Sequence, residues 1–396
     1  MLEPPVPFGN PAARWYFVLL RELVARGHDV TCFAACSKQS EIDEARRIFA
    51  APEYDLRLYP FPAGGGGIRT KLRTLRRPYS YMFSDNLRRD LEAELARGFD
   101  VLHMEALWSG WLGLAYRERA LVNVHYLFSV DHAEIEVQGV GNRIRQWLTR
   151  RGERRLIRSY PRLVTISDRL REELLKLSPH ADVSICPLGI DPSLYTYIPD
   201  QQRTDQPIVG IIGNMNWYPT RSAAVRLLTR LWPEIKRRVP NAKVQLVGWD
   251  ARAVLSQFVA MQDVVIEENV PDPQPYFERT GVMLYAPSRG TGMKIKVLES
   301  LGFGVPVVTT SEGVEGLPAK DGEHAGICED DAGLIERTVA LLLDRDLQNQ
   351  QRAAGRALLE AHCGAGPTVD AMERAYASVL ASQTLPEEEF RWLIHQ

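Results

Sequence analysis

A short glycine-rich segment with two nearby lysines has the chemistry of a phosphate-binding loop. Residues 290–292 are Gly-Thr-Gly and follow an apolar run that is typical of a buried strand. A helical pattern begins directly after them, and the free N–H groups and dipole of a helix N-terminus attract an anion. Glycine lets the backbone approach a phosphate closely, and Lys294 and Lys296 add positive charge. These features favour the binding of an anion, and a diphosphate is one that would fit.

Lys296 and Glu299 are three positions apart and share one face of the predicted helix. A carboxylate accepts hydrogen bonds from two hydroxyl groups well, so Glu299 could hold a ribose diol while Lys296 faces the diphosphate. A salt bridge between the two side chains on the helix surface explains the same spacing. From spacing alone both interpretations stay open, because a short glycine loop before a helix is a common pattern.

The elements that must position these residues alternate between short apolar runs and amphipathic stretches, as in doubly wound α/β folds. In the first half, strands are expected at residues 29–33, 55–59, 101–104, 121–125 and 162–166, and helices at 13–25 and 85–96. In the second half, strands are expected at 208–212, 243–247, 264–266, 282–285 and 305–309, and helices at 222–238 and 294–301. Two such sets predict two Rossmann-like domains, whose ligands bind beyond the C-terminal strand ends.

A polar run without apolar residues divides the two sets and is interpreted as a linker. The expected divisions are an N-terminal Rossmann-like domain at 1–199, the linker at 200–206, a nucleotide-binding Rossmann-like domain at 207–380 and a tail at 381–396. The first domain begins almost at its expected glycine loop, Gly9 and Asn10, so its first strand is predicted to be missing or very short. Such a start indicates either a native start upstream of Met1 or a weakened domain.

The composition excludes several classes of protein. Of the 396 residues, 45% are hydrophobic and 25% charged, which is the globular range, and no apolar run reaches the length of a membrane span. The formal net charge of −2 gives no signal for binding nucleic acid. The five cysteines form no CxxC pair or zinc spacing, which favours a reducing cytoplasm.

Basic residues cluster at residues 69–77 and again at 143–158. Solvated helix faces explain both clusters. The alternative is a surface that meets anionic lipid head groups or a phosphorylated acceptor. That alternative would place a cytoplasmic protein peripherally at the inner face of the membrane.

The segment around residues 290–299 resembles the donor-binding signature of glycosyltransferase family four, the retaining group 1 glycosyl transferases. Further stretches resemble motifs of the same family in the same order, at residues 23–30, 164–168, 186–191, 213–219 and 309–317. The resemblance covers roughly residues 4–380. It implies a GT-B fold, in which two Rossmann-like domains face each other across a cleft, and a C-terminal domain that binds a sugar nucleotide.

The resemblance also assigns roles to residues at the matched positions. His125, Lys296 and Glu299 are expected to act in catalysis, and His125 is expected to position the reacting sugar carbon. Taken alone, His125 fits a packed or capping histidine equally well. The expected donor-binding residues are Gly9, Asn10, Gly213, Asn214, Asn216, Gly290, Thr291, Gly292, Lys294, Lys296 and Glu299.

Some positions depart from the family pattern. The family has two glutamates separated by seven residues, and Thr291 stands at the first position, so only Glu299 remains. A branch of the family has a glycine loop and a lysine here instead. Asn10 replaces the second glycine of the N-terminal loop, and Asn tolerates the left-handed conformation better than most residues. The first loop of the donor domain carries Asn214 and Asn216 in place of a basic clamp.

The implied reaction moves a sugar from a nucleoside-diphosphate sugar to an acceptor such as a lipid-linked or envelope glycan. Asp131, His132 and Glu134 suit acceptor recognition or general-base catalysis, although helix capping explains them at least as well. Because lysines and a helix N-terminus are available for the diphosphate, no metal or other cofactor is expected. Two alternatives stay open: a nucleotide-sugar 2-epimerase, which needs no acceptor, and a non-catalytic GT-B binding or scaffold subunit.

Overall fold

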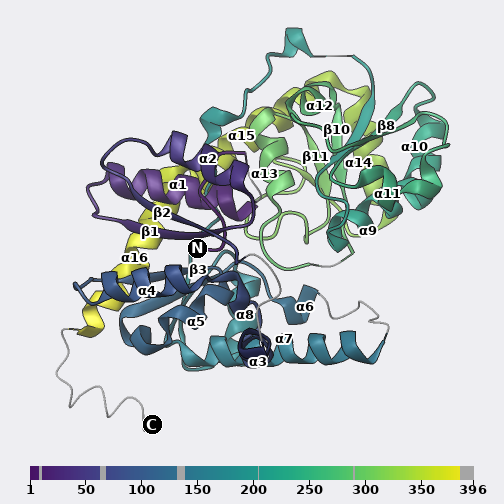
Figure 1. Cartoon of the computed structure of the whole chain (residues 1–396). Coiled ribbons are helices and arrows are strands. Elements are labelled where there is room, and N and C mark those ends of the chain that lie inside the picture. Colours follow the sequence, from purple (N-terminus) through teal and green to yellow (C-terminus); the bar gives the residue numbers. More distant parts are fainter. Residues whose placement is uncertain (9–10, 63–67, 132–138, 204, 289, 384–396) are drawn as a thin grey trace. The chain divides into compact units, whose positions relative to one another are not determined.

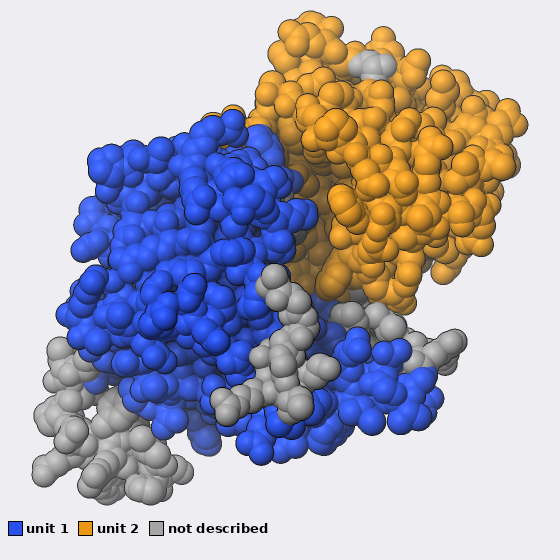
Figure 2. Space-filling view, in the orientation of Figure 1, with its two compact units in different colours: residues 1–190, 365–396 blue, residues 191–364 orange. Residues whose placement is uncertain are grey.

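The computed structural model describes residues 1–8, 11–62, 68–131, 139–203, 205–288 and 290–383. The chain divides into two compact units, whose elements Figure 1 labels and whose surfaces Figure 2 colours differently. Unit 1 consists of Met1–Ile190 and Ala365–Gln396, and unit 2 of Asp191–Gly364. Each unit contains parallel sheets and helices, which confirms the predicted α/β class. Within the described ranges, no helix is both long enough and apolar enough to cross a bilayer.

The strands of unit 1 form two separate parallel sheets. One is the pair β1 (Thr31–Cys36) and β2 (Asp55–Pro60); the other has the order β3 (Leu102–Glu105), β4 (Ala120–Val124), β5 (Arg162–Thr165) and β6 (Asp182–Ile185). The helices are α1 (Pro11–Ala25), α2 (Gln39–Ile48), α3 (Ile68–Arg76), α4 (Asp85–Leu95), α5 (Gly110–Gly113), α6 (Phe128–Asp131), α7 (Val140–Ser159), α8 (Asp168–Leu177) and α16 (Ala365–Gln383). Every residue of β4 and β5 is buried, as expected for parallel strands covered on both faces.

Met1 pairs with the strand β1. The terminal ammonium group of Met1 donates a hydrogen bond to the carbonyl oxygen of Phe33 (2.7 Å), and the N–H of Ala35 donates to the carbonyl oxygen of Met1 (3.1 Å). This pattern places Met1 beside Ala34 of β1 in parallel register. The described residues before α1 form no strand of their own.

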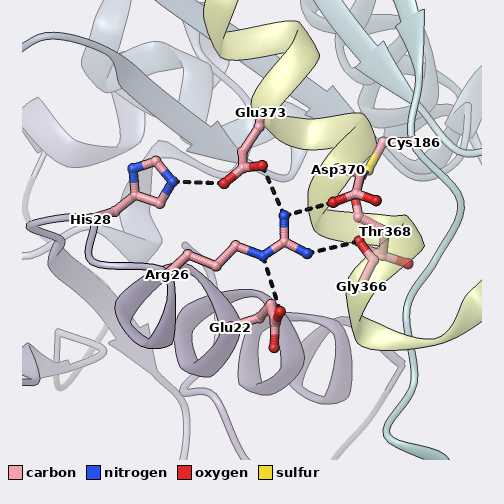
Figure 3. A network of polar contacts seen from close by, with 8 residues as sticks. All are labelled: Glu22, Arg26, His28, Cys186, Gly366, Thr368, Asp370 and Glu373. Carbon is pink, nitrogen blue, oxygen red and sulfur yellow. Dashed lines mark hydrogen bonds and ion pairs between the residues drawn. The ribbon is translucent and has the colours of Figure 1, made fainter.

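The helix α16 returns from the end of the chain to pack on α1 in unit 1 (Figure 3). The guanidinium of Arg26, which follows α1, contacts Glu22, Asp370 and Glu373 at 3.0, 2.6 and 2.8 Å. His28 lies 2.8 Å from the second oxygen of Glu373. These contacts attach the C-terminal helix to the first helix of the chain.

The position of α16 corrects the predicted domain boundaries. Residues 207–380 were expected to form one domain, but the part from Ala365 onward belongs to unit 1. The physical reason is an apolar stripe of Val369, Met372, Ala375 and Val379, which is buried in that unit.

Unit 2 contains a six-stranded parallel sheet with the order β12-β11-β10-β7-β8-β9. Its strands are β7 (Ile208–Ile212), β8 (Lys243–Gly248), β9 (Val264–Glu268), β10 (Val282–Tyr285), β11 (Val307–Thr309) and β12 (Gly326–Ile327). Its helices are α9 (Tyr218–Arg226), α10 (Trp232–Arg238), α11 (Ala251–Val254), α12 (Gln274–Arg279), α13 (Ile295–Phe303), α14 (Asp331–Leu343) and α15 (Arg345–Cys363). This is the doubly wound strand order, and its direction reverses between β7 and β10.

The predicted linker at residues 200–206 is attached to unit 2. Asp200 lies in a short 3-10 turn, and its Oδ1 lies 2.6 Å from Nε of Arg345 at the start of α15. The guanidinium of Arg352 donates a hydrogen bond to the carbonyl oxygen of Ile198 in the same region. The units therefore divide earlier than predicted, at Asp191.

Candidate functional site

The loops after β7 and β10 bring the predicted donor residues of unit 2 together. Because β7 and β10 are neighbours where the strand order reverses, their C-terminal ends flank the usual ligand crevice of such a sheet. Gly213 follows β7 directly, and residues 290–294 lead from β10 to α13. A Cβ atom at Gly213 would lie 2.9 Å from Cε of Lys296, so the lysine side chain reaches the β7 loop. Two segments far apart in the sequence thus form one site.

Lys296 is a buried cation at this edge of the sheet. Its side chain is buried, and its ammonium lies 4.7 Å from the centre of the Tyr285 ring. Burial, reinforced by the charge of Lys294, lowers the pKa of Lys296 to about 8, and Glu299 opposes this shift. No ion pair of the described residues includes Lys296. A buried ammonium without an ion-pair partner is costly, so an anionic ligand would stabilise it.

Lys294 differs from Lys296 because it has a carboxylate partner. Its Nζ lies 3.6 Å from Oε2 of Glu315 and donates a hydrogen bond to the carbonyl oxygen of Gly292. The N–H of Gly292 in turn donates to Oε1 of Glu315 at 3.0 Å. Gly292 has a φ of +77°, a left-handed conformation that favours glycine. Glu315 therefore holds the glycine loop in place and neutralises Lys294.

Glu299 lies one turn after Lys296 on α13, and both side chains are buried. The alternative of a salt bridge on an exposed helix surface is therefore wrong. Thr291 and Gly290 are buried as well, and a Cβ atom at Gly290 would lie 3.1 Å from Cγ of Pro219. The glycine loop is thus packed against the start of α9, and the segment from the loop to Glu299 forms one buried structure.

Asn214 and Asn216 shape the loop after β7. The N–H of Asn216 donates to Oδ1 of Asn214 at 2.9 Å, and Nδ2 of Asn216 donates to the carboxylate of Asp250. Gly248 at the end of β8 lies so close that a Cβ atom there would overlap the carbonyl oxygen of Gly213. Both asparagines therefore have a role in loop conformation, and their contact with a donor stays a prediction.

A buried carboxylate organises the corresponding sheet edge of unit 1. Glu105 is the last residue of β3, and its Oε2 lies 3.0 Å from Nε2 of His125, which directly follows β4. Its Oε1 accepts hydrogen bonds from Nε1 of Trp15 (2.6 Å) and Nδ2 of Asn123 (3.3 Å). Burial opposes the ionisation of Glu105, but His103 and His125 outweigh it and hold its pKa well below the usual value. Glu105 is therefore an anion that orients His125.

His125 is both packed and oriented. Its ring lies edge-on to the rings of Trp15 and Tyr16, with centroids 6.1 and 6.3 Å away. Because Nε2 faces Glu105, only Nδ1 is left for another partner. A histidine held by a carboxylate in a defined orientation is suited to contact a substrate. The structure thus agrees with the packed interpretation without excluding the functional one.

Of the three predicted acceptor residues, the structure describes Asp131. Asp131 is buried at the end of α6, and Glu153 of α7 accepts hydrogen bonds from the N–H groups of Phe128 (2.6 Å) and Ser129 (3.0 Å). Burial raises the pKa of Glu153, and the charge of Asp131 adds to this effect. Glu153, rather than Asp131, therefore caps the start of α6. The predicted residues that lie outside the described part of the chain are Gly9, Asn10, His132 and Glu134.

Two organising residues, Glu105 and Glu315, are absent from the predicted site. Glu105 stands directly after the apolar run at residues 101–104, and a charged residue at that place is a recognisable signal for the C-terminal edge of a sheet. Glu315 belongs to the matched segment at residues 309–317. Its distance from Gly292 along the sequence gives no sign that the two residues are in contact.

Two family models match successive parts of the chain. The model of Glycosyltransferase Family 4 matches residues 12–194, and the model of Glycosyl transferases group 1 matches residues 206–344. A comparison with curated protein sequences gives no match.

Solved structures with a similar fold cover nearly the whole chain. A sucrose-phosphate synthase from Thermosynechococcus elongatus has a TM-score of 0.65 at 16% identity, over 92% of this chain and 92% of its own. A mutant of TarM from S. aureus, in complex with fondaparinux, α-GlcNAc-glycerol and UDP, has a TM-score of 0.66 at 10% identity, over 95% and 98%. WaaG, a glycosyltransferase involved in lipopolysaccharide biosynthesis, has a TM-score of 0.60 at 13% identity, over 94% and 97%. The two family models together match most of the chain, which therefore belongs to the group 1 glycosyl transferases of glycosyltransferase family four, and the solved structures show that it has the GT-B fold.

Proposed function

We propose that the protein transfers a sugar from a nucleoside-diphosphate sugar to a lipid-linked or envelope glycan, with retention of configuration. The observation that carries this proposal is the buried Lys296, which lies where the strand order of unit 2 reverses, beside the glycine loop and one turn before Glu299. A buried ammonium with no ion-pair partner among the described residues gains most from an anionic ligand. A diphosphate supplies that charge.

In this proposal, the backbone at residues 290–292 and the ammonium of Lys296 bind the diphosphate. Glu299 accepts hydrogen bonds from the ribose hydroxyls. Lys294 adds to the positive field of the site, while Glu315 keeps the loop in its conformation. Since lysines supply the positive charge, we propose that the reaction needs no metal ion. UDP is the first nucleotide to test, because the TarM structure contains it.

The proposed chemistry is a displacement on one face of the sugar. The acceptor oxygen forms a bond with the anomeric carbon as the bond from that carbon to the diphosphate oxygen breaks. The acceptor proton moves to the departing phosphate oxygen, so no strong enzymic base is needed. Lys296 stabilises the negative charge that develops on the diphosphate. In unit 1, we propose that His125, oriented by Glu105, contacts the sugar and that Asp131 contributes to acceptor binding.

The proposed acceptor class follows from a protein that shares this fold. WaaG takes part in lipopolysaccharide biosynthesis and shares this fold, which favours a glycan of the cell envelope. Such acceptors are carried by lipids, so we propose that the protein works at the inner face of the membrane.

The test is a thermal-shift panel with UDP, GDP, ADP, dTDP, CDP and their common sugars, in the presence of a chelator. We expect one nucleotide series to raise the melting temperature, because a ligand that binds only the folded protein stabilises it. Glu299→Ala should abolish the rise, whereas Glu336→Ala, at an exposed glutamate of the same unit, should keep it. A rise that appears only after a divalent metal is added would contradict metal independence.

The panel and its products also separate the alternatives. Transfer of the sugar to an acceptor by the protein that binds the donor supports the proposal. An epimerised nucleotide sugar formed without any acceptor would identify a 2-epimerase instead. Binding without turnover would favour a scaffold subunit, and the absence of any shift in folded protein would contradict the donor site itself.

A further inference from the structure

The helices α3 and α7 of unit 1 carry arginines and exposed apolar side chains on the same surface. The two helices contact each other, and Figure 1 shows α3 against the long helix α7. We call their shared surface the α3–α7 face. Its described members are Leu72, Arg73, Leu75, Arg76, Arg77, Ile144, Trp147, Arg151 and Arg155.

Four arginines surround a hollow on this face. The hollow has a volume of about 490 Å³ and is lined by Leu72, Arg73, Arg76, Arg77 and Arg155. Asp85 lies 3.6 Å from Arg73, and its carboxylate is almost fully exposed to water. Guanidinium groups bind phosphate oxygens in bidentate fashion, and four of them around one hollow give it the positive charge to hold phosphate groups.

The positive charge in this region is poorly compensated. Arg88, on the adjacent helix α4, has its pKa lowered to about 10, first by burial and then by the charges of Arg73 and Arg77. Along α7, seven arginines accompany a single acidic residue, Glu153. Glu153 is buried and accepts hydrogen bonds from the backbone of α6, so it leaves the outer surface of α7 without a carboxylate.

A row of two apolar side chains and two arginines leads along α7 towards the hollow. Ile144, Trp147, Arg151 and Arg155 are spaced by three or four positions, which places them along one side of the helix. The guanidinium of Arg151 lies over the Trp147 ring at 5.5 Å. Trp147 is 58% exposed, and Ile144 is exposed as well.

On α3, Leu72 and Leu75 are likewise exposed. Single exposed apolar side chains are ordinary, whereas these two contacting helices expose four of them beside arginines. Tryptophan and leucine beside arginines are the composition of helices that lie in a membrane interface.

We propose that the α3–α7 face docks on an anionic lipid bilayer. The arginines around the hollow bind lipid phosphate groups, and Leu72, Leu75, Ile144 and Trp147 enter the interface. A soluble polyanion would be attracted by the arginines but would gain nothing from the apolar side chains, which favours the bilayer. The docking does not depend on the donor site, but its consequence, that the acceptor is taken from the membrane, rests on the proposed function.

The experiment is vesicle flotation of the full chain. One set of vesicles contains phosphatidylcholine alone, and the other contains phosphatidylcholine mixed with phosphatidylglycerol. We expect binding to the mixed vesicles only, and we expect added salt to weaken it. Arg76→Gln and Arg151→Gln should each lower the partition coefficient about fivefold, since one basic residue near an anionic surface contributes that much.

Trp147→Ala tests the apolar part of the face. It should weaken vesicle binding at least as strongly as an arginine variant, whereas Trp249→Ala, at a tryptophan of unit 2 with a nearly equal exposed fraction of 56%, should not. Both replaced side chains are exposed, and thermal unfolding checks that the variants fold. Equal binding to both vesicle types, or vesicle binding unchanged in Trp147→Ala and the arginine variants, would overturn the proposal.

Two further outcomes separate this proposal from its rivals. If Trp147→Ala binds vesicles normally and heparin competes fully through the arginines, a soluble polyanion is the partner and the bilayer proposal is wrong. Nucleotide-induced thermal shifts in the same variants should stay at the wild-type value, because the face lies in unit 1 and the donor residues lie in unit 2. A variant that loses vesicle binding but keeps the nucleotide shift therefore supports docking independently of the donor site.

Discussion

Both units place a buried carboxylate near the C-terminal edge of a parallel sheet, but the two carboxylates have different partners. Glu105 of unit 1 contacts two imidazoles and an indole, whereas Glu315 of unit 2 contacts a lysine and a loop N–H. Imidazole and indole can bind hydroxyl groups and rings while neutral. The lysines of unit 2 instead add the charge that a diphosphate needs. The two sheet edges are alike in having a buried carboxylate. The groups that contact this carboxylate differ, and they decide which ligand each edge can bind.

The largest expected effect comes from Glu315→Gln. This change removes the carboxylate that pairs with the buried ammonium of Lys294, which should cost about 3–5 kcal/mol of the free energy of unfolding. The measurement is urea denaturation with linear extrapolation. The double variant Lys294→Met with Glu315→Met removes both charges and should lose much less. Equal losses in the single and double variants would show that the pair does not stabilise unit 2.

Lys296→Met should produce the next largest effect, on catalysis. Removing one charge donor at the departing diphosphate should lower kcat/KM by a factor equivalent to about 2–4 kcal/mol. The matched control is Lys243→Met, at an exposed lysine that begins β8 at the opposite edge of the same sheet. Steady-state kinetics with the donor found in the thermal-shift panel supply the measurement. Near-wild-type turnover of Lys296→Met would remove this residue from the mechanism.

In unit 1, Glu105→Gln should cost about 1.5–3 kcal/mol of stability at neutral pH, because hydrogen bonds to a charged group are lost. The pKa of Glu105 lies well below its usual value, so its contribution is present above about pH 4.5. That contribution disappears as the pH falls through the lowered pKa. The difference in unfolding free energy between wild type and variant should therefore shrink in acid, whereas Glu118→Gln, at an exposed position, should behave like wild type. A pH-independent difference would contradict an ionised Glu105.

The smallest expected effect is the pH dependence of nucleotide binding. Because the pKa of Lys296 is about 8 in the free protein, the lysine loses its charge as the pH rises from 7 to 9. If only the charged form binds, the affinity should fall about tenfold, or about 1.4 kcal/mol. Isothermal titration calorimetry measures this change, and Lys296→Met should flatten it. An equal pH dependence in wild type and Lys296→Met would assign the effect to another group.

Much of the donor site could be predicted from the sequence because its parts are local. The glycine loop, Lys296 and Glu299 occur within one strand-loop-helix segment, and their spacing already places them at one sheet edge. Glu315 could not be predicted in the same way. It follows β11, and only the folded loop brings its carboxylate to Gly292.

The fold was predictable in its elements but less so in its boundaries. Buried parallel strands such as β4, β7 and β10 have continuous apolar runs, so their positions agree with the sequence within a residue or so. The strand β1 begins two residues later than predicted and extends to Cys36, because alanine and cysteine are weak indicators of a strand. For α16, the apolar stripe predicts burial but does not identify the unit that buries it.

The most direct test of the account is a crystal structure of the protein with the nucleotide that the thermal-shift panel selects. We predict that the ribose hydroxyls contact the carboxylate of Glu299 and that the diphosphate lies beside Lys296 and the backbone of Gly290 and Gly292. A nucleotide bound elsewhere, with Lys296 and Glu299 unoccupied, would contradict the donor site in unit 2.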